Sequence, residues 1–149
     1  MRASRSVEID APTETVYALA QDVARWPEIL PHYRWVRVVS EGTGERIVEM
    51  AARRDFIPVR WTARQTLDPV TPRIGFTHLS GWTKGMQVAW LFDRRGARTA
   101  VTIVHELDHS AFSIGGAWFA RRVIGDFFIQ SIAGKTLARM KELAEKQHA

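Results

Sequence analysis

The pattern with the most direct chemical meaning is His105-Glu106-Leu107-Asp108-His109, which matches the H-E-x-x-H motif of zinc proteases. That motif binds zinc on a helix, where residues four apart share one face. Residues 101–104, just before it, alternate instead as a strand. On a strand, residues four apart lie about 13 Å from each other, whereas the ligands of one zinc ion lie within about 4 Å. We therefore interpret the motif as a chance occurrence and expect no metal site.

His105 has a chemical interpretation of its own. It shares a predicted strand face with Ile103 and Leu107, so the alternation directs its ring into the apolar interior. There it is either a buried histidine with one hydrogen-bond partner or a proton donor or acceptor for a bound carbonyl compound. His78, two residues after Phe76 on another predicted strand, has the same two interpretations.

Aromatic residues are the second group that could act on a ligand. Six tryptophans in 149 residues are more than a thin sheet easily buries. Trp61 and Trp90 lie on separate predicted strands with apolar neighbours on the same face, which favours them as walls of an internal cavity. Packing in the core or on the surface is the alternative for each tryptophan. Tyr33 either donates a hydrogen bond to a ligand oxygen or packs at the end of the domain.

Seven predicted strands and three helices position these side chains. Apolar alternation between glycine or proline turns predicts strands over 2–9, 33–40, 45–54, 58–67, 73–79, 86–94 and 98–109. Thr13 is expected to cap a helix after the first strand, and Pro27 limits the next segment to a short helix or turn. Spacings of three and four predict a long helix from about Gly116 nearly to the C-terminus. The expected fold is α+β, with a curved antiparallel sheet wrapped around the C-terminal helix and two short helices closing one end.

Composition narrows the classes of function. The length favours one domain over residues 1–149, and no linker or repeat divides it. The absence of cysteine excludes disulfides, thiolate zinc sites and cysteine nucleophiles. The net charge of +5 is scattered along the chain, so we expect no nucleic-acid partner; weak attraction to anionic membrane surfaces and a homodimer remain open. No apolar run has the length of a signal peptide or a transmembrane segment, which predicts a cytoplasmic protein.

Four motifs resemble the START/polyketide-cyclase superfamily of helix-grip proteins. They are Ala-Pro-x-x-x-Val-Tyr (residues 11–17), Asp-x-x-x-Trp-Pro-Glu (22–28), Gly-Met-x-x-x-Trp (85–90) and Thr-x-x-His (102–105), and they span nearly the whole chain. The chain is most similar to the polyketide cyclase/dehydrase branch, which also includes coenzyme Q-binding proteins and a ribosome-association toxin. The resemblance is specific for the fold rather than for one activity, because this fold hosts many functions.

The resemblance implies a cavity that binds a hydrophobic small molecule without a metal or cofactor. The predicted ligand-binding residues are Trp26, Trp61, Phe76, His78, Met86, Trp90, Phe127 and Phe128, and the candidate catalytic residues are Tyr33, Gln65 and His105. The family's cyclases carry an arginine on the strand of Trp61. Strand alternation directs Arg60 and Arg64 outward and places Gln65 in that position. A neutral amide orients a carbonyl but stabilises an enolate poorly.

Three functions are compatible with these residues. The first is binding of a polyketide, quinone or lipid-like compound in an aromatic cavity. The second is a cofactor-free polyketide aromatase/cyclase, in which Tyr33, Gln65, His78 and His105 orient carbonyls and transfer protons. The third is an interaction module that uses basic residues, Arg121 and Arg122 among them, to associate with ribosomes or membranes.

Overall fold

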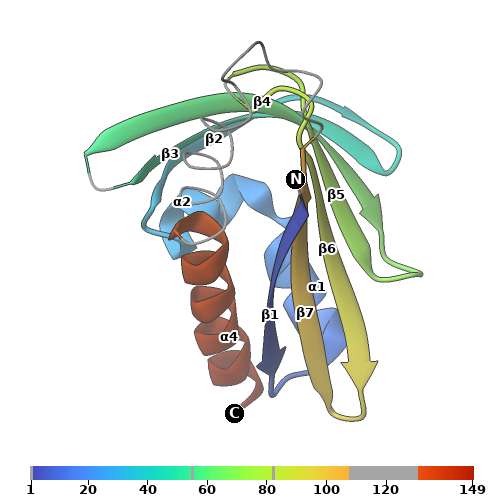
Figure 1. Ribbon diagram of the computed structural model, residues 1–149. Helices are drawn as coiled ribbons and strands as arrows, with labels where there is room; N and C mark the ends of the chain where they lie inside the picture. Colours follow the sequence, from blue (N-terminus) through green and yellow to red (C-terminus); the bar gives the residue numbers. More distant parts are fainter. Residues whose placement is uncertain (1, 55, 82, 108–130) are drawn as a thin grey trace.

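A seven-stranded antiparallel sheet curves around the C-terminal helix in the computed structural model, which describes residues 2–54, 56–81, 83–107 and 131–149 (Figure 1). The strand order is β1-β7-β6-β5-β4-β3-β2. The elements are β1 (Arg2–Ile9), α1 (Thr13–Gln21), the 3-10 turn η1 (Val23–Arg25), α2 (Trp26–Ile29), β2 (Tyr33–Gly42), β3 (Glu45–Arg54), β4 (Ile57–Asp68), β5 (Arg73–His78), β6 (Gln87–Arg95), β7 (Arg98–Glu106) and α4 (Gly134–His148).

The predicted fold class and all seven strands are confirmed. β7 ends at Glu106 rather than at His109, and Met86 precedes β6 rather than opening it. His105 and Glu106 therefore lie on a strand, where the helical geometry of a zinc-protease motif does not form. The predicted start of the long helix near Gly116 lies outside the described residues, and α4 covers its second half.

The expectation that Thr13 caps α1 is wrong. Pro12 occupies the N-cap position, and no side chain caps the helix. The Thr13 hydroxyl instead lies 3.0 Å from the Thr99 hydroxyl of β7, inside the core. The Thr13 hydroxyl thus makes a tertiary hydrogen bond instead of the helix-capping bond that the local sequence predicted.

Strand alternation separates an apolar concave face from a charged convex one. On β4, Trp61 and Gln65 are buried, whereas Arg60 and Arg64 are exposed, as predicted. The same alternation brings three strands into register on the concave face, because Val88 of β6 pairs with Phe76 on one side and His105 on the other. These three side chains are buried neighbours beneath the helices.

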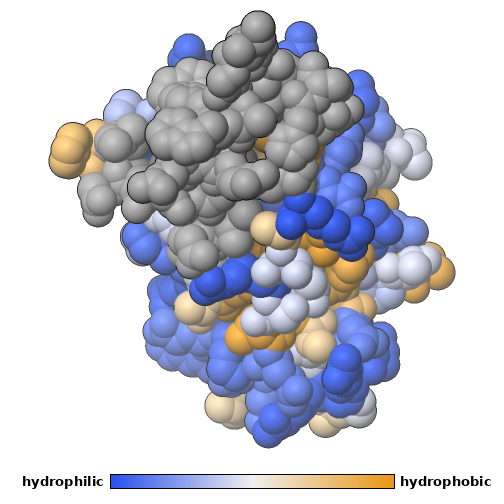
Figure 2. Space-filling view, viewed as in Figure 1, coloured by the Kyte–Doolittle hydropathy of each residue, from blue (hydrophilic) through white to orange (hydrophobic). Residues whose placement is uncertain are grey.

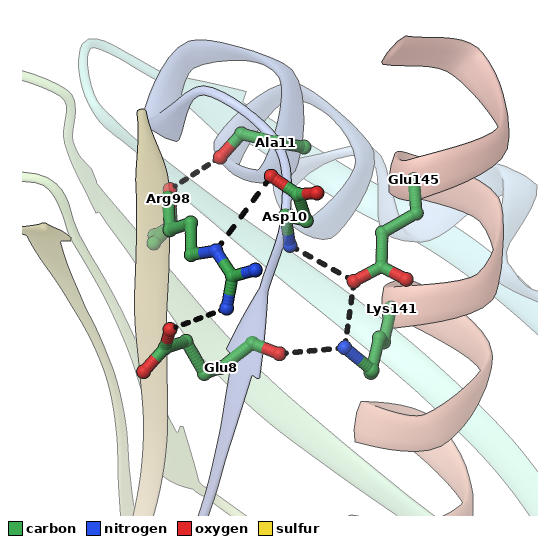
Figure 3. A network of polar contacts seen from close by, with 7 residues as sticks. Glu8, Asp10, Ala11, Arg98, Lys141 and Glu145 are labelled. Carbon is green, nitrogen blue, oxygen red and sulfur yellow. Dashed lines mark hydrogen bonds and ion pairs between the residues drawn. The ribbon is translucent and has the colours of Figure 1, made fainter. Parts of the chain in front are cut away.

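Polar contacts join the C-terminal half of α4 to the end of β1 (Figure 3). Lys141 Nζ donates to the Glu8 carbonyl oxygen at 2.8 Å and to Glu145 Oε2 at 2.6 Å. The same Glu145 carboxylate accepts from the Asp10 backbone N–H at 2.9 Å. Arg98 of β7 pairs with Glu8 and Asp10. The helix is therefore fixed against the sheet at this end by several groups rather than by apolar packing alone.

The surface around these elements is mostly hydrophilic. Figure 2 shows polar residues over most of the visible lower part of the molecule, with hydrophobic residues in a narrow strip between them. None of the helices in the described part of the chain has the length and apolarity to span a bilayer.

Candidate functional site

A small cavity lies between the concave face of the sheet and the start of α4. Its volume is about 40 Å³, which is room for a few water molecules. Among the described residues it is lined by Trp26, Tyr33, Met50, Trp61, Phe76, His78, Val88, Trp90, Ile103, His105, Ile132, Ala133 and Thr136. None of these carries an acidic or permanently cationic group, so the cavity suits an uncharged ligand with apolar surface.

Five of these thirteen lining residues are tryptophan, tyrosine or phenylalanine, and Trp26 lies at the centre of their rings. Its ring centroid lies 5.1 Å from Tyr33, 5.9 Å from Phe76 and 5.7 Å from Trp90. α2 places Trp26 there, because the helix begins at this residue and Pro27 occupies its first turn, where proline is tolerated. The buried Trp26 Nε1 has no hydrogen-bond partner among the described residues. An oxygen of a bound molecule would satisfy this donor.

Two buried histidines provide titratable polar groups in the cavity wall. The His78 ring stacks on Trp61 with centroids 5.5 Å apart, and His78 Nδ1 lies 2.6 Å from the Thr83 hydroxyl. Burial, together with His105, lowers the pKa of His78 to about 3, and burial lowers the pKa of His105 to about 4. Both imidazoles are therefore neutral at pH 7 and able to donate or accept one hydrogen bond at each ring nitrogen, according to tautomer.

Tyr33 adds a phenol to the same cavity. It begins β2 and is buried, and burial raises its pKa well above the ordinary value. The hydroxyl therefore stays protonated at neutral pH and is available as a hydrogen-bond donor. With the two histidines, the described lining offers neutral donors and acceptors but no strong base.

The family of the chain is given by a comparison with family models. Residues 9–135 match the model described as "Polyketide cyclase / dehydrase and lipid transport". The chain belongs to this family. The resemblance inferred from the motifs at residues 11–17 and 22–28 is thereby confirmed.

Relatives and solved structures agree with this membership. The chain is 33% identical over 108 residues to the granaticin polyketide synthase bifunctional cyclase/dehydratase of Streptomyces violaceoruber, covering 70% of this chain and 33% of the relative. It is similar in fold to the ZhuI aromatase/cyclase from Streptomyces sp. R1128, with a TM-score of 0.89, 21% identity and coverage of 100% and 96%. It also matches the di-domain ARO/CYC BexL from the BE-7585A biosynthetic pathway, with a TM-score of 0.74, 29% identity and coverage of 95% and 45%. The chain thus spans less than half the length of its curated and di-domain relatives.

Within this polyketide cyclase/dehydrase domain, two predicted site residues lie outside the described cavity lining. Gln65 is fully buried beside Phe76, and its Nε2 donates to the Gln21 carbonyl oxygen at 3.2 Å. That bond joins β4 to the end of α1, while Gln65 Oε1 has no partner among the described residues. Met86 is also fully buried but is not a lining residue. The roles proposed for both residues remain predictions.

Most of the other residues that the sequence assigned to the site do line the cavity. The cavity brings together Trp26, Tyr33, Trp61, Phe76, His78, Trp90 and His105. Phe127 and Phe128, predicted to bind ligand, and the basic pair at 121–122 lie outside the described residues. Sequence reasoning missed the lining residues Met50, Val88, Ile103, Ile132, Ala133 and Thr136. Strand alternation would have found the first three, but no local signal marks Thr136. The described residues contain no group of three acidic, histidine or cysteine side chains arranged to hold a metal.

Proposed function

We propose that this domain binds a hydrophobic small molecule of the polyketide type in its internal cavity and holds it in a defined conformation. The observation that carries the proposal is the aromatic wall around Trp26, interrupted by the neutral polar groups of Tyr33, His78 and His105. Flat rings complement an aromatic or polyenolic ligand, and the few polar groups fix the positions of its oxygens. The names of the polyketide cyclase/dehydratase relatives support the same class of ligand.

Entry of such a ligand requires the lining to move. A cavity of about 40 Å³ holds a few waters, whereas a molecule of two or three fused rings displaces far more volume. We therefore infer that binding proceeds by rearrangement of lining side chains, which changes the surroundings of Trp26, Trp61 and Trp90.

Binding is tested by titrating the protein with a dihydroxyanthraquinone and following tryptophan fluorescence. We expect saturable quenching with one molecule per chain, since three tryptophans line the cavity. Saturable binding at a different stoichiometry, or none, would argue against a single internal site.

The cytoplasmic location, the homodimer and the weak attraction to anionic membranes remain predictions.

Catalysis of ring closure is a second candidate, because the cavity wall places His78 and His105, which burial keeps unprotonated and weakly basic, where they could orient carbonyls and transfer protons. In aldol closure an imidazole takes a proton from a carbon next to a carbonyl, that carbon bonds to a second carbonyl carbon, and the proton goes to the alkoxide oxygen that forms. In dehydration a second proton leaves the same carbon and the hydroxyl departs as water, so both steps balance without a cofactor. Comparing wild type with His105→Gln on a poly-β-ketone substrate separates the two functions. A carrier keeps both ligand affinity and product pattern, whereas a cyclase keeps affinity and loses about a hundredfold or more in turnover.

A further inference from the structure

A basic cleft lies on the surface beside the start of α4. Its volume is about 430 Å³, and among the described residues it is lined by Pro31, His32, Arg53, Lys135 and Arg139. These residues come from the α2–β2 connection, from β3 and from α4. Arginine and lysine make up three of the five, and no acidic residue is among them. Segments far apart in the sequence thus converge on one positively charged depression.

The basic cleft adjoins the internal cavity. His32 of the cleft has its Nε2 2.9 Å from the hydroxyl of Thr136, which is buried and lines the cavity. The next residue, Tyr33, also lines the cavity, and its ring centroid lies 4.9 Å from that of His32. The His32–Thr136 hydrogen bond is therefore a point at which the two spaces are separated by a single layer of side chains.

The cleft carries uncompensated positive charge. Arg139 pairs with Glu142 at 2.8 Å and donates to the Ile29 carbonyl oxygen at 3.0 Å, so it is held in place and largely neutralised. Arg53 and Lys135 have no acidic partner in the part of the chain that the structure describes. Burial and the nearby Lys135 lower the pKa of His32 to about 4, so this ring is neutral and adds no charge.

We propose that the basic cleft binds the phosphate group of an amphipathic ligand whose apolar part occupies the cavity. The inference rests on the proposed function, because the cavity supplies the other half of the site. The charges of Arg53 and Lys135 match that of a phosphate monoester dianion, and the planar guanidinium of Arg53 can donate two N–H groups to its oxygens. The His32–Thr136 layer is where such a ligand passes from one space to the other.

The test compares naphthol with naphthyl phosphate by calorimetric titration at low ionic strength and neutral pH. The two probes share an aromatic body and differ in the phosphate. We expect the phosphate to bind about tenfold more tightly, with the advantage shrinking as salt is added. The double variant Arg53→Gln/Lys135→Gln should lose this advantage and keep its affinity for naphthol. The matched control Lys146→Gln removes an exposed charge at the far end of α4 and should behave as wild type.

Three other outcomes would overturn the phosphate site, and they show whether the cavity function fails with it. Equal affinity for both probes, or a preference that survives the double variant, removes the phosphate site and leaves the cavity function standing. Failure of both probes to bind removes the proposed function together with it. Sedimentation with phosphatidic acid vesicles, without a preference for naphthyl phosphate in solution, would make the cleft a membrane contact and contradict a soluble phosphate ligand.

Discussion

Lowering the pH from about 6.5 to about 5 will destabilise the protein by about 3 kcal/mol through His78 and His105. In the unfolded chain both histidines titrate near 6.5, whereas burial keeps them unprotonated in the fold until about pH 3 and about pH 4. The unfolded state therefore binds more protons throughout this interval, and stability falls as the pH falls. Each histidine contributes about 1.5 kcal/mol over the interval, to order of magnitude.

Denaturant unfolding at several pH values measures this effect. The variant His105→Gln should lose about a third to a half of the pH dependence between pH 6.5 and pH 5, because His78 and the partly buried His32 keep their contributions. His148 is exposed at the end of α4, so His148→Gln is the matched control and should keep the full dependence. An unchanged slope in His105→Gln would show that this histidine is not buried in its neutral form.

Replacing Trp26 with alanine will lower the free energy of unfolding by about 3–5 kcal/mol. Trp26 is buried and contacts three aromatic rings, so truncation removes the centre of the cluster and leaves a large void. Trp26→Phe should cost far less, because it keeps an aromatic ring and removes an N–H that has no acceptor among the described residues.

The control for this prediction is Trp35→Ala. Trp35 is half-buried on the edge strand β2, where the Arg37 guanidinium carbon lies 5.5 Å from its ring centroid. Its loss should cost about 1 kcal/mol or less. Unfolding in guanidinium chloride gives the free energy of unfolding of Trp26→Ala, Trp26→Phe and Trp35→Ala for this comparison. Similar costs for Trp26→Ala and Trp35→Ala would contradict the central position of Trp26.

Local sequence patterns predicted most of the fold because the sheet is antiparallel and has one apolar face. Alternation along β4 correctly separated Trp61 from Arg60 and Arg64, and the glycine and proline turns located the strand ends to within a few residues. The predicted cap at Thr13 was wrong because its hydroxyl hydrogen-bonds to that of Thr99, which is 86 positions away in the sequence. Local sequence patterns cannot predict such a contact.

The cavity was harder to predict because its lining depends on which residues of α4 face the sheet. Thr136 and His32 are 104 positions apart, and their hydrogen bond forms only once the helix is docked. Gln65 shows the opposite difficulty. Alternation correctly predicted that Gln65 points into the interior, but its amide nitrogen donates a hydrogen bond to the end of α1. A side chain that points inward therefore need not line the cavity.

The most direct test of the cavity function is an indole N–H spectrum of isotope-labelled protein during titration with naphthol. Trp26, Trp61 and Trp90 line the cavity, whereas Trp35 lies outside it and serves as an internal reference. We predict saturable shifts of the three lining indoles at one equivalent, largest for Trp26 because its N–H lacks an acceptor among the described residues, with Trp35 unmoved. Shifts confined to Trp35, or no shifts at all, would contradict a ligand-binding cavity at this place in the fold.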